Sequence, residues 1–133
     1  EQHIAAGTDL NQTDEYGSTP LNIAITFNKE EVAIALIKGG SDLSVTTADG
    51  STPLISAAFF GRTAIVQELI HNKADITATN SFGATALATV STSFEEVKPI
   101  YDQISKDLGP LGFKLDYHSL QTERKAIAEL LNQ

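Results

Sequence analysis

The feature that most constrains this chain is a sequence repeat with a period of 33 residues. Three glycines mark it: Gly17, Gly50 and Gly83. Each glycine opens a similar five-residue phrase, Gly-Ser-Thr-Pro-Leu in two copies and Gly-Ala-Thr-Ala-Leu in the third: 17–21, 50–54 and 83–87. A second phrase, a small residue or threonine followed by Asp and an aliphatic residue, keeps the same spacing: 8–10, 41–43 and 74–76. Two markers in one register predict a chain built from stacked copies of one small unit.

Within a unit, the pattern predicts a turn, a short helix, a second turn and a second helix. In the unit that follows Gly17, Thr19 can cap the first helix and Pro20 falls where a proline costs no hydrogen bond. The second helix shows apolar residues at helical spacing over 32–37, and Gly40 can end it in a left-handed conformation. No unit of this size can bury its apolar face alone, so neighbouring units must stack.

These phrases resemble the ankyrin repeat, whose family phrase is Thr-Pro-Leu-His-x-Ala and whose helix pair ends in a Gly-Ala-Asp-Val-Asn-like segment. The resemblance covers roughly residues 4–97. It implies an all-α solenoid of helix–turn–helix units with β-turn tips and atypical ends. We therefore expect a single domain with a partial repeat, three repeats and a C-terminal capping helix: 1–13, about 14–46, 47–79 and 80–112, and about 119–132.

The chain departs from the family phrase in every repeat. Asn22, Ile55 and Ala88 stand where the family has histidine, and Ala86 replaces the proline of the third repeat. Lys73 occupies a glycine position, where a left-handed backbone would cost about 1–2 kcal/mol. These changes weaken individual units without altering the predicted architecture.

Beyond the third repeat's first helix, the register drifts. Residues 94–97 (Phe-Glu-Glu-Val) repeat residues 29–32 (Lys-Glu-Glu-Val) with one residue deleted between the copies. Pro99 is expected to start or interrupt the next helix, which would end near residue 106, before a Gly-Pro-Leu-Gly break at 109–112. An amphipathic closing helix then seals the last core.

Composition narrows the classes of partner. The chain has 17 acidic and 9 basic residues and a net charge of -8, which argues against nucleic acid or an anionic membrane and favours a basic partner protein. Apolar stretches are too short to span a bilayer. Without cysteine or methionine, and starting at Glu1, the sequence favours an exported, periplasmic bacterial protein, with the cytoplasm as the alternative.

No constellation for catalysis or metal binding stands out, so we expect no enzyme activity, no metal site and no cofactor. The three histidines lie far apart, without ligand spacing: His3, His71 and His118. Three aspartates recur at the repeat period and are expected to bond local backbone: Asp9, Asp42 and Asp75.

The positions that ankyrin proteins vary to suit their partners hold five of the nine aromatic residues. The resemblance implies the following partner-binding residues: Glu15, Tyr16, Ser18, Thr26, Phe27, Asp49, Ser51, Phe59, Phe60, Ser81, Phe82 and Thr92. The five aromatics among them would form a hot spot, with Asp14, Glu15 and Asp49 giving an acidic rim. For Phe59 and Phe60, burial between adjacent repeats is the alternative.

We therefore expect a non-catalytic module, monomeric when free, whose concave face grips one folded protein. A more specific version is an inhibitor or immunity-type protein that covers the active site of an enzyme, for example a hydrolase. The alternative is a scaffold or adaptor segment of a longer solenoid. The 107–118 connection is a candidate second contact surface.

Overall fold

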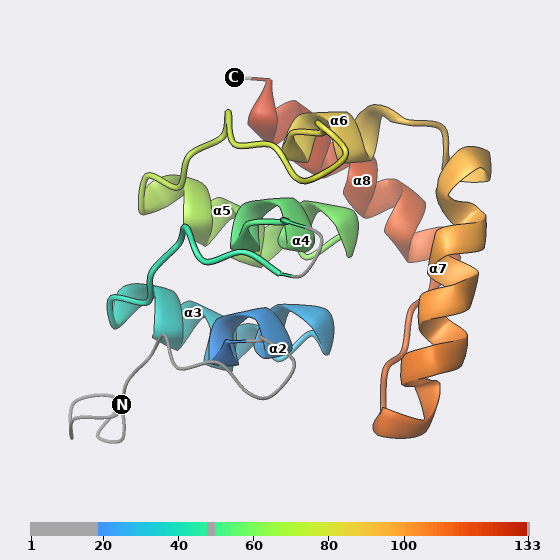
Figure 1. The fold of residues 1–133 in the computed structure, drawn as a ribbon, viewed down its shortest axis with the longest axis horizontal. Coiled ribbons are helices and arrows are strands. Elements are labelled where there is room, and N and C mark those ends of the chain that lie inside the picture. The colour runs from blue at the N-terminus through green and yellow to red at the C-terminus, as the bar shows by residue number, and fades with distance from the viewer. Residues whose placement is uncertain (1–18, 48–49, 133) are drawn as a thin grey trace.

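The computed structural model describes residues 19–47 and 50–132. This part of the chain holds seven α-helices, one short 3-10 helix and no strand, which confirms the expected all-α class. The elements, shown in Figure 1, are α2 (Pro20–Thr26), α3 (Glu30–Lys38), α4 (Pro53–Phe59), α5 (Thr63–His71), α6 (Ala86–Ser91), α7 (Phe94–Leu108), η1 (Gly109–Leu111) and α8 (Tyr117–Leu131).

The first helix of each described unit begins at a capping threonine. Thr19, Thr52 and Thr85 each accept a hydrogen bond from the backbone N–H three residues later, at 3.2, 3.2 and 3.1 Å. A proline follows the cap in α2 and α4, as predicted, whereas α6 begins with Ala86. The cap therefore starts the helix even where the proline is absent.

The helices stack in layers (Figure 1). Helix α2 packs on α3 and α4 packs on α5, while α2, α4 and α6 pack in sequence as an inner row. The outer row is α3, then α5, then α8, because α8 packs on both α5 and α6. One apolar core runs through these layers, from Leu21 and Ile25 in α2 to Ile127 and Leu131 in α8.

Left-handed residues end the outer helices where the repeat predicts them. Gly40 has a φ of 99° after α3, and Lys73 has a φ of 65° at the matching position after α5. The lysine therefore adopts the strained conformation that its place in the repeat implied.

Helix α7 differs from the sequence-based expectation at its start. The helix begins at Phe94, where the Ser93 side chain accepts from the backbone N–H of Glu96, and it continues through Pro99 to Leu108. The expectation that Pro99 would start or interrupt the helix is wrong. A proline at this position removes one backbone hydrogen bond, and burial of Val97 and Tyr101 on either side of it offsets that loss.

The direction of α7 follows from the deleted residue. Three residues join α2 to α3 and three join α4 to α5, and the middle one is left-handed in both cases: Asn28 with a φ of 57° and Gly61 with a φ of 72°. Only Thr92 and Ser93 join α6 to α7, and both are extended. Without a left-handed residue to reverse the chain, α7 leaves the outer row and runs alongside the layers (Figure 1).

Candidate functional site

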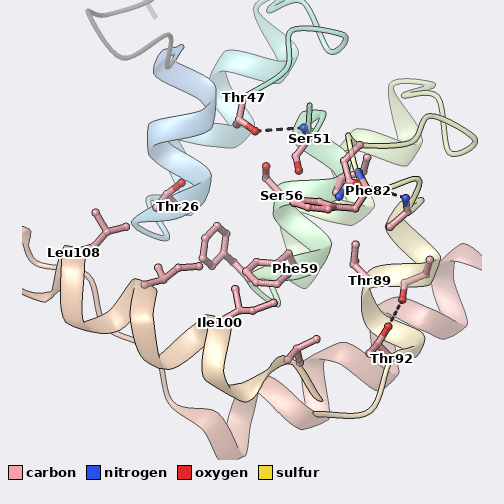
Figure 2. A pocket seen from close by; sticks show the side chains of 17 residues that line it. Thr26, Thr47, Ser51, Ser56, Phe59, Phe82, Thr89, Thr92, Ile100 and Leu108 are labelled. Carbon is pink, nitrogen blue, oxygen red and sulfur yellow. Dashed lines mark hydrogen bonds between the residues drawn. The ribbon is translucent and has the colours of Figure 1, made fainter. Parts of the chain in front are cut away.

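A groove of about 620 Å³ separates the inner row from α7 (Figure 2). One wall comes from α2, α4, α6 and the turns before them, and the other from the side of α7 that faces the stack. The described residues that line it are Thr26, Thr47, Ser51, Ile55, Ser56, Phe59, Phe60, Asn80, Phe82, Ala84, Ala88, Thr89, Thr92, Val97, Ile100, Ile104 and Leu108.

None of these lining residues is ionisable, and most are apolar. Three of the threonines donate their hydroxyl protons to carbonyls of their own helices: Thr26 to Asn22 at 2.9 Å, Thr89 to Ala86 at 2.7 Å and Thr92 to Ala88 at 3.1 Å. The groove is therefore an apolar surface with few free hydrogen-bond donors.

Ser56 is a polar side chain within this surface. The residue is 7% exposed and lines the groove. Its hydroxyl can form a hydrogen bond with a bound molecule that offers a polar group.

Helix α7 is held against the stack by an aromatic cluster around Tyr101. The Tyr101 ring stacks on Phe59 with centroids 4.5 Å apart and on Phe94 at 5.9 Å, and its hydroxyl donates to the Phe59 carbonyl. Arg124 of α8 donates to the same hydroxyl at 3.1 Å. Burial raises the pKa of Tyr101 above its ordinary value of 10.0, so this hydroxyl stays protonated at neutral pH. The far wall of the groove is thus a fixed part of the fold.

Two buried arginines fix the ends of inner helices. Arg62 donates to the carbonyls of Ile25 and Thr26 at 2.9 and 2.7 Å, and Arg124 donates to the carbonyl of Thr92. A cation at a helix C-terminus is favoured by the helix dipole. Burial lowers the pKa of Arg62 to about 10, which still leaves it charged at neutral pH.

Phe113, in the loop after η1, covers part of the aromatic cluster predicted to bind a partner. Its ring meets Phe27 and Phe60 edge-on, with centroids 6.2 and 5.7 Å away, and it is 5% exposed. Phe82 is not covered in this way and is 83% exposed. The described aromatics therefore divide into a group held by the chain itself and one ring open to a partner.

The structure brings together most of the predicted partner-binding residues that it describes. Six of the eight line the groove: Thr26, Ser51, Phe59, Phe60, Phe82 and Thr92. Phe27 packs on Phe113 instead, and Ser81 is exposed outside the lining. The other residues of that prediction lie outside the described residues, and their role stays a prediction: Asp14, Glu15, Tyr16, Ser18 and Asp49.

The sequence pattern did not predict the α7 wall. Val97, Ile100, Ile104 and Leu108 line the groove at spacings of three, four and four residues, which is the spacing of one helix face. The period is visible in the sequence, but the repeat register placed this segment in the outer row, where the same face would point into a core.

The described residues hold no group of three or more His, Asp or Glu side chains placed to bind a metal, and no helix in 19–47 or 50–132 is long and apolar enough to cross a membrane. Asp42 and Asp75 accept from the backbone N–H groups of Ser44 and Thr77 at 2.8 Å, as predicted. Hydrogen bonds from those same residues lower the pKa of both carboxyl groups.

Comparison with models of protein families identifies the family of this chain. The family model for ankyrin repeats, in three copies, matches residues 1–80, and the chain belongs to this family. Ankyrin repeats are protein–protein interaction modules and are typically non-catalytic. No curated protein matches the chain.

Proposed function

We propose that this protein binds another protein through the groove between its inner helices and α7. The observation that carries the proposal is convergence: six residues that the repeat register marks as partner-facing, drawn from three separate units, line one groove. A non-catalytic interaction module uses such a surface to hold a partner.

The character of the surface supports a protein partner. Phe82 on one side and Ile100 on the other are large apolar side chains that remain 83% and 51% exposed. Exposed apolar residues at the mouth of an apolar groove are typical of a binding site, and aromatic anchors in such sites carry much of the binding energy. A partner that covers both side chains gains binding free energy from burial of their apolar surface.

Two finer readings are open to the same experiment. An inhibitor or immunity-type protein would occlude the active site of its partner, for example a hydrolase, so the partner's activity would fall on binding. A scaffold or adaptor segment would bind without changing activity. The division into repeats at about 14–46, 47–79 and 80–112 belongs to this proposal, because it assigns the partner-facing positions.

The test is capture of a partner with the full chain as bait, beside a Phe82→Ser bait. Phe82 is 83% exposed, so the substitution leaves the fold intact, as circular dichroism will show. Ile76→Ser is the matched control, because Ile76 is 44% exposed and lies outside the groove. Leu111→Ser, 71% exposed, tests the 107–118 connection.

We expect one captured protein to be lost by Phe82→Ser and retained by both other baits. Retention by Phe82→Ser with loss by Leu111→Ser would move the site to the connection and contradict the proposal. The captured protein's activity, measured with and without this chain, then separates an inhibitor from an adaptor.

A further inference from the structure

We infer that the groove receives one amphipathic α-helix of the partner, with an apolar stripe that faces the groove and Lys or Arg side chains beside the stripe. This inference rests on the proposed function of the groove as a protein-binding site. Four properties of the groove lead to it: the spacing of its α7 wall, the shape of the opposite wall, its shortage of backbone partners and the charge along its rim.

The α7 wall presents a helix-type stripe. Val97, Ile100, Ile104 and Leu108 follow the spacing of one helix face over 11 residues, which is about 16 Å at 1.5 Å per residue. The same stripe within a bundle would pack on another helix. Here it faces the groove, and Ile100 is 51% exposed although it belongs to the stripe. An incoming helix of three turns matches its length.

The opposite wall suits a close approach. Ala84 and Ala88 are small, and Ile55 stands where the ankyrin phrase has a histidine and is 2% exposed. The Ser56 side chain lies on this wall and lines the groove. One polar side chain within the apolar stripe of the incoming helix would pair with it.

The shortage of hydrogen-bond partners favours a helix over an extended peptide. Buried backbone N–H and C=O groups must be paired, and an extended segment needs a sheet edge or many side-chain partners to pair them. Residues 19–47 and 50–132 contain no strand, and the threonines Thr26, Thr89 and Thr92 already donate within their own helices. A helix pairs its own backbone groups before it enters.

The rim of α7 supplies the charge complementarity. Glu96, Gln103 and Asp107 share a helix stripe with Ile100, at spacings of four, three and four residues, and all three are exposed. Glu96 accepts from Ser93 at 3.2 Å and Asp107 from Gln103 at 2.9 Å, and neither carboxylate has an ion pair among the described residues. In a chain of net charge -8, this rim attracts basic side chains.

The test uses a display library of helical peptides of about 18 residues, which is longer than the roughly 12–15 residues below which an isolated helix is marginal in water. Stripe positions vary among Leu, Ile, Val, Met and Phe, with Ser and Asn allowed at one of them. Flanking positions vary among Lys, Arg, Glu, Asp and Gln. The full chain is the bait, and the selected peptides are then synthesised and their affinities measured by fluorescence anisotropy.

Ile100→Ser and Val32→Ser form a matched pair, because Ile100 is 51% and Val32 53% exposed and only Ile100 lines the groove. We expect Ile100→Ser to weaken binding by about tenfold or more and Val32→Ser to leave it unchanged.

The double variant Glu96→Gln with Asp107→Asn tests the charged rim. It should weaken binding by about threefold to tenfold, with a smaller effect at high salt. Glu31→Gln with Glu129→Gln, which removes two exposed carboxylates from α3 and α8, is its control.

Selection of peptides with Lys or Arg at the flanks, lost with Ile100→Ser, supports the inference. It is overturned if no helical peptide is enriched, if Glu or Asp dominates the flanks, or if Ile100→Ser leaves binding intact. A natural partner that Phe82→Ser loses, together with a failed library, would keep the proposed function and reject the helix. If the selected helical peptides depend on Ile100 but the natural partner still binds the Phe82→Ser bait, the groove is kept as a helix-binding site and the proposed function is rejected.

Discussion

The first two helix pairs and the C-terminal third of the molecule solve the same packing problem in different ways. In the pairs α2–α3 and α4–α5, three residues with a left-handed middle residue send the second helix back along the first. After α6 the connection is one residue shorter, and the next helix in the chain leaves the stack. A later helix, α8, covers α6 instead. One deletion in a turn has freed a whole helix to form the second wall of a groove.

If α8 is a full member of the outer row, its central apolar residue should contribute as much to the free energy of unfolding as its counterpart in α5. Ile127 and Ile65 are both fully buried in the same core. We expect Ile127→Ala and Ile65→Ala each to lower the free energy of unfolding by about 2–5 kcal/mol, because each leaves a cavity. Urea unfolding followed by circular dichroism measures both. A separate early transition in Ile127→Ala alone would show that α8 is an appendage.

The two buried arginines allow a second comparison. Arg62 lies in the regular part, which is the helix pairs α2–α3 and α4–α5, and Arg124 lies in the irregular part, which runs from α6 to α8. Each donates to the carbonyls that end an inner helix. We expect Arg62→Met and Arg124→Met to cost about 1–3 kcal/mol each, since unpaired carbonyls remain in a buried site. Arg124→Met should also loosen α7, because it removes the donor to Tyr101. Hydrogen exchange that rises in α7 after Arg62→Met instead would contradict this assignment.

Alkaline pH should destabilise the fold through Tyr101. Residues 19–85 contain no tyrosine, whereas burial raises the pKa of Tyr101 above its value of 10.0 in the unfolded chain. The stabilisation from neutral Tyr101 is therefore complete below pH 10 and is lost as pH rises through the higher folded-state pKa.

The measurement is the free energy of unfolding across this pH range for the native chain and for Tyr101→Phe. The variant should cost about 1 kcal/mol at neutral pH, where it loses its hydroxyl bonds, and should show a smaller decline at high pH. Tyr117, whose pKa is also raised by desolvation and by its bond to Asp102, contributes to the slope in the same direction, whereas the lowered pKa of Arg62 contributes in the opposite direction. An unchanged slope in Tyr101→Phe would exclude Tyr101 as the main titrating group.

The smallest effect compares two turns within the regular part. Gly40 and Lys73 hold matching left-handed positions, with φ values of 99° and 65°. Lys73→Gly should stabilise the protein by about 0.5–1 kcal/mol, because it removes strain at some cost in chain entropy. Gly40→Lys should do the opposite, since a Cβ there meets no atom within 4 Å and only strain is added. Thermal unfolding of the pair checks both signs, and shifts in the same direction would exclude backbone strain as the cause.

Much of the regular part was predictable because its signals are local. Thr19 and Thr52 act as caps, and the Asp42 and Asp75 side chains bond the backbone two residues on, as their sequence neighbours imply. Lys73 is left-handed because its place in the repeat demands it. Each of these features depends on a few adjacent residues, so a repeat period suffices to find it.

The α7 wall depends instead on contacts between distant segments. The deleted residue near 94–97 was visible in the sequence, but its effect on direction came from the loss of a left-handed turn and from Tyr101 reaching Phe59, 42 residues away. The contacts of Phe113 with Phe27 and Phe60 also join segments that lie far apart in the sequence. Contacts between distant segments cannot be predicted from the sequence period. The sequence therefore predicted only the inner wall of the groove.

The donors that end the three inner helices all come from later in the chain: Arg62 for α2, Tyr101 for α4 and Arg124 for α6. During synthesis, therefore, no layer is finished until a following one has left the ribosome. Arg124 also supports Tyr101, so a premature stop before the last helix would remove a support from α4 as well as from α6. Placement of the 15-residue helix α8 therefore completes two of the three inner layers, whereas the donor for α2 comes from Arg62.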